Sequence, residues 1–324
     1  MSNFLNTNID FFGLDISDSY LRIAKIKKNK KGLYLSSFAE KEIDLKDKIE
    51  DSKFLGLAIK DLIKKTKGDK INTRHVALSL PEEKSFLQVI EMPKMKEEEL
   101  KKALAYEAEN YIPLPMNDVY FDFQIIRSFE EKNLLEILVI AFPKKIIDNH
   151  IYFIEKAGFI PTILEIEPIS IARSVIKNNQ EVSPTLLIDI GKTRASFIIF
   201  SKKSIRFTSS VFFPLEELNK KDNNDFLSPV IDEVIKTTKK CLSFYDSRHF
   251  GSSFDSDIEN IDNIIISGEG KNLNDFAQKL LEEIDIKIKI GDPFANFYKG
   301  EFNISKNEAL NYRIAFGLAL RSFI

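Results

Sequence analysis

The sequence is poor in cysteine, histidine, glycine and proline. A single cysteine, Cys241, cannot form an internal disulfide, and one cysteine with three histidines is too few for a structural zinc site unless carboxylates contribute. The 12 glycines and 11 prolines stand beside 27 phenylalanines and a hydrophobic fraction of 44%, which excludes a disordered or low-complexity chain. For 324 residues we therefore expect about two packed domains in a reducing compartment.

Long apolar segments are also missing. The longest uninterrupted apolar run is the six-residue stretch from Ile137 to Phe142, whereas about 20 residues are needed to cross a bilayer. The first residues carry no basic region, and Asp10 and Asp15 interrupt any segment that could act as a signal peptide. We therefore expect a cytoplasmic protein without a membrane-spanning segment.

The sequence has little excess charge of either sign, because 47 Lys and Arg residues oppose 49 Asp and Glu residues, for a net charge of −2. Binding to a nucleic-acid backbone depends on a surplus of basic residues that displace counterions from the phosphates. We therefore expect no nucleic-acid partner.

The pattern of apolar residues predicts two clusters of strands, each followed by helices. The first cluster has three strands within residues 9–38 and is followed by a helix over 53–66. The second has three strands within residues 185–211 and is followed by a helix over 229–246. A last helix is expected over 306–322. This order of elements is typical of an α/β protein.

Between the clusters, the sequence pattern changes to long strands and a charged helix, which indicates an inserted subdomain of roughly residues 80–145. It contains a strand from Ser85, a charged helix over 96–110 and two long strands joined by a polar turn. The chain then resumes with a helix over 144–158, a strand, and a second helix that has Pro168 in its first turn, where a missing N–H group costs no hydrogen bond.

The first strands of the two clusters end in similar turns. Aligning Asp189 with Asp15 also places Ile188 on Leu14. The repeated unit is long and occurs twice, so it predicts two similar domains that face each other rather than a solenoid.

Each of these turns combines a strand-end carboxylate with small or hydroxylic residues. Successive backbone N–H groups in such a turn can cradle phosphate oxygens, and hydroxyl groups add donors. The carboxylates can then hold the water shell of Mg²⁺, an ion that takes few protein ligands. The candidate phosphate-binding residues are Asp15, Ser17 and Ser19 in the first turn and Asp189, Gly191 and Thr193 in the second, with Asp15 and Asp189 as candidate metal residues.

A third turn, Ser267 to Gly270, joins an apolar strand to a helix. Gly268 and Gly270 permit the backbone to approach a flat or anionic ligand, and the following helix offers the positive end of its dipole. The turn matches neither a Walker A loop nor a GxGxxG motif. On its own, the pattern is more typical of an ordinary strand-to-helix turn.

The order of these motifs resembles the actin-like ATPase superfamily. An LDIS turn, an IDIG turn and a later SGEG turn follow one another, and the helical segment LEIEPISIAR precedes the second turn. Within this superfamily, the chain is similar to the PilM family of type IV pilus assembly proteins. That similarity extends from Gly13 to Arg321 and is carried by EMPKMKEEELKKALAYEAENYIPLPMNDVYFDFQII, by VIAFPKKIIDNHIYFIEKAGFIPTILEIEP, by DPF at 292–294 and by FGLALR at 316–321.

The resemblance implies an α/β fold of the actin-like (ribonuclease H-like) type, with two duplicated lobes and a small inserted α+β subdomain. It places the first lobe in residues 1–182, with the insert at about 80–145. The second lobe then occupies residues 183–305, and a C-terminal helix within 306–324 returns to the first lobe.

The family also implies what the protein binds. Its members hold ATP, here expected with Mg²⁺, in the cleft between the lobes and capture the N-terminal cytoplasmic tail of the membrane protein PilN. We therefore expect an ATP-binding scaffold, at most a slow ATPase, that meets a PilN-like tail and other pilus proteins and is compatible with a homo-oligomer. Through these partners it would lie at the inner face of the cytoplasmic membrane.

Carried onto this sequence, the resemblance assigns further site residues. Glu167 falls where relatives place the residue that orients the attacking water, although a carboxylate that accepts N–H groups of the next helix would look the same. Glu233 and Lys236 fall where relatives often contact the ribose or the adenine. Gly268 and Gly270 fall on the adenosine turn.

Two positions depart from the family pattern. Ser17 stands in the first turn where the family usually has glycine, and its hydroxyl group adds a donor while backbone freedom is reduced. Glu269 stands in the adenosine turn where glycine is common, and it adds a negative charge near an anionic ligand. We therefore expect nucleotide binding with slow hydrolysis.

Two alternatives remain open at this point. One is an ATP-dependent small-molecule kinase of the same fold, which needs a sugar pocket and a catalytic base that no motif nominates. The other is a nucleotide-free platform component of a type II secretion system, a kind of protein that usually continues into a membrane span. ATP binding with and without sugars separates the scaffold from the kinase, and capture of membrane pilus proteins tests the platform.

Overall fold

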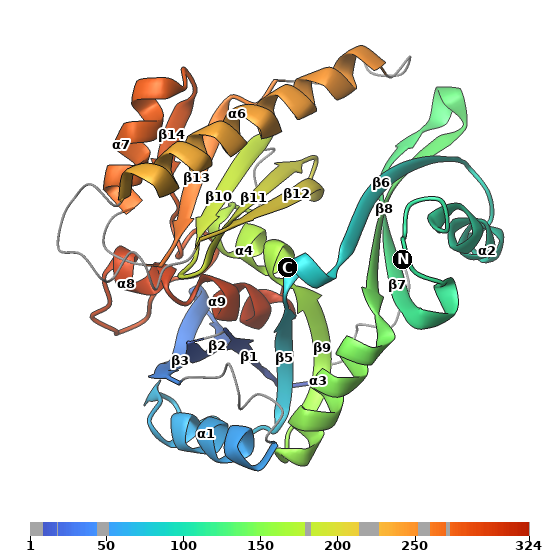
Figure 1. The fold of residues 1–324 in the computed structure, drawn as a ribbon. Helices are drawn as coiled ribbons and strands as arrows, with labels where there is room; N and C mark the ends of the chain where they lie inside the picture. Colours follow the sequence, from blue (N-terminus) through green and yellow to red (C-terminus); the bar gives the residue numbers. More distant parts are fainter. Residues whose placement is uncertain are drawn as a thin grey trace. The chain divides into compact units, whose positions relative to one another are not determined.

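The computed structural model describes residues 9–17, 19–43, 52–178, 183–213, 227–251, 260–269 and 273–323. These residues form two compact units, both drawn in Figure 1. Unit 1 takes those within Met1–Ser85, Phe142–Asn178 and Asp292–Ile324, and unit 2 takes those within Phe86–Ala141 and Asn179–Gly291. Within these residues, no helix is both long and apolar enough to span a bilayer.

Unit 1 is built on a six-stranded sheet with the order β4-β3-β2-β1-β5-β9. Strands β1 to β4 pair antiparallel with one another, whereas β5 runs parallel to both β1 and β9. Successive residues of a strand point to opposite faces, so the sheet presents apolar side chains on both. The bounds are Phe12–Ile16 for β1, Tyr20–Asn29 for β2, Gly32–Glu42 for β3, Lys67–Gly68 for β4, His75–Leu80 for β5 and Ile160–Ile166 for β9.

Helices cover both faces of this sheet. Phe12 and Leu14 of β1 belong to an apolar cluster with α1 and α3. Ala24 of β2 and Phe38 of β3 belong to a second cluster with α8 and α9. The helices of unit 1 are α1 (Ser52–Lys64), α3 (Lys144–Lys156), α4 (Glu167–Val175), α8 (Lys306–Leu310) and α9 (Arg313–Leu320).

Helix α9 is buried along its whole length. It approaches α4 so closely that a Cβ atom on Gly317 would lie 1.9 Å from the carbonyl oxygen of Ser170. Only glycine allows this approach. The close contact places α9 at the centre of unit 1.

The single helix expected over 306–322 is broken into α8 and α9. Between them, the N–H group of Asn311 donates to Glu308 and that of Tyr312 donates to Ala309, so these bonds span three residues rather than four. The ring of Tyr312 meets that of Phe38 edge-on, with centroids 5.2 Å apart. Packing against the sheet therefore accompanies the break, which the local sequence pattern does not show.

Unit 2 repeats this plan in its larger sheet, whose order is β12-β11-β10-β13-β14. Strands β10, β11 and β12 are antiparallel, and β13 runs parallel to both β10 and β14. The order matches β3-β2-β1-β5-β9 of unit 1, which confirms the predicted duplication. The bounds are Thr185–Ile190 for β10, Arg194–Ser201 for β11, Ser204–Phe212 for β12, Asn263–Gly268 for β13 and Lys287–Ile290 for β14, with helices α6 (Leu227–Gly251) and α7 (Leu273–Glu283).

The inserted segment forms a three-stranded sheet of order β6-β8-β7 and one helix. Leu100, Leu104 and Ala108 form the buried stripe of that helix against the sheet. An ion pair joins Glu136 of β8 to Arg206 of β12, and β6 contacts β12, so the insert packs within unit 2. The bounds are Phe86–Pro93 for β6, Glu97–Ala108 for α2, Val119–Phe129 for β7 and Leu134–Pro143 for β8.

Candidate functional site

Asp15 lies near the end of β1, and its side chain is held from the neighbouring strand. Only 1% of the residue is exposed. The hydroxyl group of Ser79 on β5 donates a hydrogen bond of 3.2 Å to Oδ1 of Asp15. Since β5 runs parallel to β1, the two strands end at the same edge of the sheet, which is where open α/β sheets place their ligands.

Arg22 provides a positive charge beside this carboxylate. It is the residue of β2 that pairs with Asp15, and its Nη1 lies 4.0 Å from Oδ2 of Asp15. Its Nε donates to Glu40 at 3.2 Å, and its guanidinium lies 4.4 Å from the centre of the Tyr20 ring. Arg22 is 2% exposed, so the cation is a fixed part of the first turn. Arg22 was not predicted from the sequence, where the signal was a basic residue inside the apolar strand YLRIAKIK.

Ser17 closes the first turn with its own side chain. Its hydroxyl group accepts a hydrogen bond from the N–H group of Tyr20 and donates one to the carbonyl group of Tyr20. Ser19 follows in the turn, and its carbonyl oxygen accepts a bond of 2.8 Å from Ile43. Ser17 therefore fixes the shape of the loop, and the N–H groups of Ser17 and Tyr20 are used within the turn.

Asp189 has the equivalent position in unit 2. It lies on β10 directly opposite Ser267 of the parallel strand β13, whose hydroxyl group donates a hydrogen bond of 2.6 Å to Oδ1. The N–H group of Gly191 donates to Arg194, and the carbonyl oxygen of Thr193 accepts a bond from Phe213. The structure thus brings the three predicted residues of the second turn together within unit 2, as it does those of the first turn within unit 1.

Gly268, in the third turn, packs closely against Ile190, which leads into the second turn. Its φ is +140°, and a Cβ atom at this position would lie only 2.1 Å from the carbonyl oxygen of Ile190, so any larger residue is excluded. The next residue, Glu269, donates its N–H group to the same carbonyl oxygen at 2.7 Å. Gly268 therefore lies beside the second turn, and Gly270 lies outside the described residues.

Glu167 is the first residue of α4 and is 8% exposed. The sequence pattern placed it at the end of a strand, but β9 ends one residue earlier. At this position its negative charge interacts favourably with the positive, N-terminal end of the helix dipole. Both a water-orienting role and a helix-capping role remain compatible with its place.

Glu165 is a neighbouring buried carboxylate that was not predicted from the sequence. Both of its oxygens accept hydrogen bonds from Arg173, at 2.5 and 2.6 Å, and the hydroxyl group of Ser170 donates a third bond of 2.8 Å. Arg321 adds an ion pair at 3.3 Å. Glu165 thus ties β9 to α4 and to the end of α9, which is a structural role.

Glu233 and Lys236 lie one turn apart on α6 and contact each other. Nζ of Lys236 is 3.0 Å from Oε2 of Glu233, and both side chains are partly exposed. The same helix carries Cys241, whose burial raises the pKa of the thiol to about 12. Cys241 is therefore protonated at neutral pH and packs as an apolar residue.

Each of the two turns offers a carboxylate that suits Mg²⁺. Within the described ranges, no group of three or more His, Cys, Asp or Glu side chains could hold a metal ion. A hydrated magnesium ion needs only one or two carboxylates, and it prefers oxygen donors. A serine hydroxyl group donates to each of the two carboxylates, and the guanidinium of Arg22 also lies beside Asp15.

Comparison with known proteins supports the same fold and assigns the family. A solved structure titled "PilM-PilN type IV pilus biogenesis complex" matches with a TM-score of 0.81 and 19% identity, over 98% of this chain and 100% of that one. The ethanolamine utilization protein EutJ from Carboxydothermus hydrogenoformans matches with a TM-score of 0.50 and 13% identity, over 95% of this chain and 88% of that one. These matches confirm the predicted actin-like fold. The family model described as "Type IV pilus assembly protein PilM" covers residues 13–221 and 214–323. The chain therefore belongs to the PilM family of type IV pilus assembly proteins.

Proposed function

We propose that this chain is an ATP-binding scaffold at the inner face of the cytoplasmic membrane that holds the N-terminal cytoplasmic tail of a PilN-like membrane protein. The observation that carries the proposal is the match to the PilM family along almost the whole chain. The similarity to a structure of PilM with PilN supports the choice of partner. The match also favours this function over a small-molecule kinase or a type II secretion platform.

The nucleotide would be bound by the turns that follow β1 and β10. Each places a fixed carboxylate beside a turn that internal hydrogen bonds hold in shape, at the edge where the parallel strands of an open α/β sheet end, which is where such sheets bind ligands. Bound Mg²⁺ would supply positive charge to the phosphates of the nucleotide. The proposed residues are Asp15 and Asp189 for the metal waters, Ser17, Ser19, Gly191 and Thr193 for the phosphates, and Gly268, Gly270, Glu233 and Lys236 for the nucleoside.

Calorimetric titration with Mg-ATP tests this binding site. Lys236→Gln should weaken binding, because Lys236 is proposed to contact the nucleoside. Lys239→Gln is the matched control, since Lys239 lies on the same helix and forms a comparable exposed ion pair with Glu283 at 2.9 Å. Equal affinities of the two variants would remove Lys236 from the site.

Glu167 is proposed to orient the attacking water, and hydrolysis should be slow. A carboxylate can accept one hydrogen bond from a water molecule, but it also repels the negative γ-phosphate. Phosphate release by the intact chain and by Glu167→Ala measures the effect. A variant that hydrolysed ATP at the original rate would leave Glu167 only its place at the start of α4.

The PilN-like tail is proposed to dock on the insert. Several large side chains on its surface are exposed, with 76% for Tyr106, 48% for Tyr111, and 46% each for Tyr120 and Ile125. Strand β7 is an edge of the three-stranded sheet, so an extended peptide could pair with it. Aromatic anchors beside an available strand edge are the features that such a peptide requires.

Fluorescence anisotropy with a labelled tail peptide tests this docking site. Tyr106→Ala should raise the Kd at least tenfold, as expected for an aromatic anchor. Tyr152→Ala is the control, since Tyr152 is 54% exposed but belongs to α3, outside the insert. Unchanged binding after deletion of residues 87–140 would contradict the docking site.

The lobes proposed from the sequence, residues 1–182 and 183–305 with a helix that returns within 306–324, define the expected proteolytic fragments. Limited proteolysis with mass spectrometry tests these boundaries. Cleavage outside the proposed junctions, with stable fragments of other sizes, would contradict them.

A further inference from the structure

The hairpin that joins β2 to β3 carries a dense group of lysines. Residues 27–31 read KKNKK, which is four lysines in five residues without an acid, although the chain has a net charge of −2. Lys28, Lys30 and Lys31 are exposed and form no ion pair with any residue that the structure describes. The tip of this hairpin is therefore a local excess of positive charge.

A distant part of the chain adds one more exposed lysine to these three. The ring of Tyr298 stacks on that of Tyr34 with centroids 5.8 Å apart, and its hydroxyl group accepts a hydrogen bond of 2.5 Å from Asn29. The N–H group of Leu35 donates to Tyr298 at 3.0 Å. These contacts hold Lys299, which is exposed, beside the hairpin. We call Lys28, Lys30, Lys31 and Lys299 the lysine cluster.

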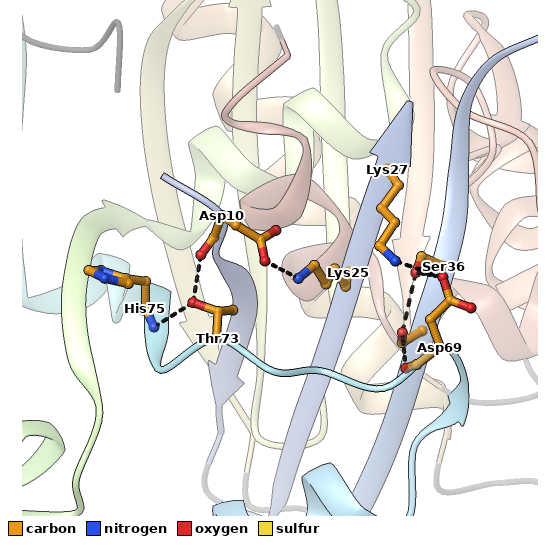
Figure 2. A network of polar contacts seen from close by, with 8 residues as sticks. Asp10, Lys25, Lys27, Ser36, Asp69, Thr73 and His75 are labelled. Atoms are coloured by element: carbon orange, nitrogen blue, oxygen red, sulfur yellow. Dashed lines mark hydrogen bonds and ion pairs between the residues drawn. The ribbon is translucent and has the colours of Figure 1, made fainter. Parts of the chain in front are cut away.

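The acids nearest to the base of the hairpin are already used by other lysines. Figure 2 shows Lys25 directed at Asp10 and Lys27 at Asp69, with ion pairs of 2.6 and 2.7 Å. The hydrogen bond to Asp69 raises the pKa of Lys27. The exposed Glu301 follows Lys299 by two residues and is the other acid next to the cluster in sequence. Among the described residues, the members of the lysine cluster form no ion pair, so an external anionic partner can meet them.

The chemistry of the cluster favours a diffuse negative surface over a single small anion. Lysine ammonium groups are hydrated point charges on flexible stems and lack the fork by which arginine recognises one phosphate group. The Tyr34 and Tyr298 rings stack on each other, so they are not placed for stacking on nucleic-acid bases. Clusters of four or more basic residues near a membrane attract anionic lipid headgroups.

We propose that the lysine cluster docks on the anionic surface of a lipid bilayer. The inference rests on the proposed function, because a scaffold that holds the tail of a membrane protein works close to the membrane. Docking would orient unit 1 with its β2–β3 hairpin toward the headgroups and add to the attachment provided by the tail. Screening by salt would weaken this contact.

Co-sedimentation of the full chain with lipid vesicles, without nucleotide or tail peptide, tests the proposal. Vesicles of phosphatidylcholine alone are compared with vesicles that also contain phosphatidylglycerol. The intact chain should sediment with the anionic vesicles and be released by high salt. K30Q/K31Q should lose about 30-fold in partitioning, since each lysine near an anionic surface contributes roughly fivefold.

K202Q/K203Q is the matched control. Lys202 and Lys203 form the exposed tip of the β11–β12 hairpin, which is the equivalent hairpin of unit 2, so this variant removes the same charge from elsewhere. It should retain binding. Unchanged melting curves show that both variants are folded.

Three results would overturn the proposal. Equal binding to neutral and anionic vesicles would exclude an electrostatic contact, and an equal loss in K202Q/K203Q would reduce the effect to net charge. Binding to a polyglutamate peptide but not to vesicles would assign the cluster to an acidic protein. Affinity for the tail peptide is measured without vesicles, so failure of the proposed function is distinguished from failure of this inference.

Discussion

Asp15 and Asp189 lie one residue before the ends of equivalent strands of the two units, and each is held by a serine from the next parallel strand. The hydrogen bonds to Oδ1 measure 3.2 Å from Ser79 and 2.6 Å from Ser267. The residue that pairs with the aspartate on the antiparallel side differs, because it is an arginine in unit 1 and a serine in unit 2. The duplicated fold has kept the position of the carboxylate and changed the charge around it.

The two turns therefore differ in the side chain that lies beside the carboxylate. In unit 1 the protein supplies a buried cation, Arg22, whose cost of burial is offset by Asp15 and Glu40. In unit 2 the residue paired with Asp189 is Ser196, and the hydroxyl group of Ser267 donates to Asp189. The first turn should therefore depend more on Arg22 than the second turn depends on Ser196.

The largest loss of stability is expected at the position where unit 2 has a glycine and unit 1 does not. Gly268 follows Ser267, whereas Leu80 follows Ser79. Gly268→Ala should lower the free energy of unfolding by about 3–5 kcal/mol, because the new Cβ would collide with the backbone of β10 at a positive φ. Urea denaturation followed by circular dichroism measures the loss.

Gly191→Ala is the control, since its Cβ would come no closer than 3.2 Å to Arg194. Similar losses of stability in both variants would contradict this account.

The second effect concerns the residues opposite the aspartates. Arg22→Met should lower the free energy of unfolding by about 3 kcal/mol, because Asp15 would remain buried without its cation. Ser196→Ala, at the same position of unit 2, should cost about 1 kcal/mol or less, since only a hydroxyl contact to Ser210 is lost. The same denaturation experiment compares them. Equal costs would show that the ion pair of unit 1 adds no stability beyond that of the serine.

A smaller effect is expected on the rise in Tm that ligand causes, and it should differ between variants of the two aspartates. Mg-ATP at a hundredfold excess over Kd should stabilise the fold by about 2.7 kcal/mol, a rise of a few degrees in Tm. Asp189→Asn should lose more of the magnesium-dependent part of this rise than Asp15→Asn, because Arg22 lies beside Asp15. Melting curves with ATP alone are the control. A Tm that did not move with millimolar Mg-ATP would favour a nucleotide-free scaffold.

The smallest effect on stability concerns the hairpins at the other ends of β11 and β2. Lys202 and Lys203 have φ angles of 51° and 63°, which are unfavourable for lysine and typical of an Asn-Gly hairpin turn. Lys202→Asn combined with Lys203→Gly should raise the free energy of unfolding by about 1 kcal/mol, measured as a higher Tm. The same exchange at Lys30 and Lys31 is the control, since neither has a positive φ. A gain of equal size there would point to charge rather than backbone strain.

The strands and their duplication could be predicted because they depend on local alternation and on a repeated motif. The alignment of Asp189 with Asp15 identified the equivalent positions that the register of β1 and β10 now shows. The two-residue strand β4, Lys67–Gly68, was missed because its pairing with β3 leaves no periodic pattern in the sequence. The break between α8 and α9 was missed because tertiary packing of Tyr312 accompanies it.

The site was predicted less completely than the fold, because its partners come from other strands. Arg22 reaches Asp15 only through the register of β1 and β2, which the sequence does not state. Glu165 and Glu167 are separated by one residue in LEIEPIS, so the pattern alone could not show which of them binds Arg173. Extending the repeat alignment to HVALSL and NIIISG would have identified Ser79 and Ser267.

The position of α9 also affects the order in which a newly synthesised chain can fold. Unit 1 cannot complete its core until Arg313–Leu320 have left the ribosome, since this buried helix packs on β1, β2 and α4. Unit 2 needs no residue beyond Gly291 and can be complete earlier. During that interval, one face of the unit 1 sheet exposes apolar side chains such as Phe38. The nascent chain is then a target for chaperones, and a product that stopped short of α9 would be prone to aggregation and degradation.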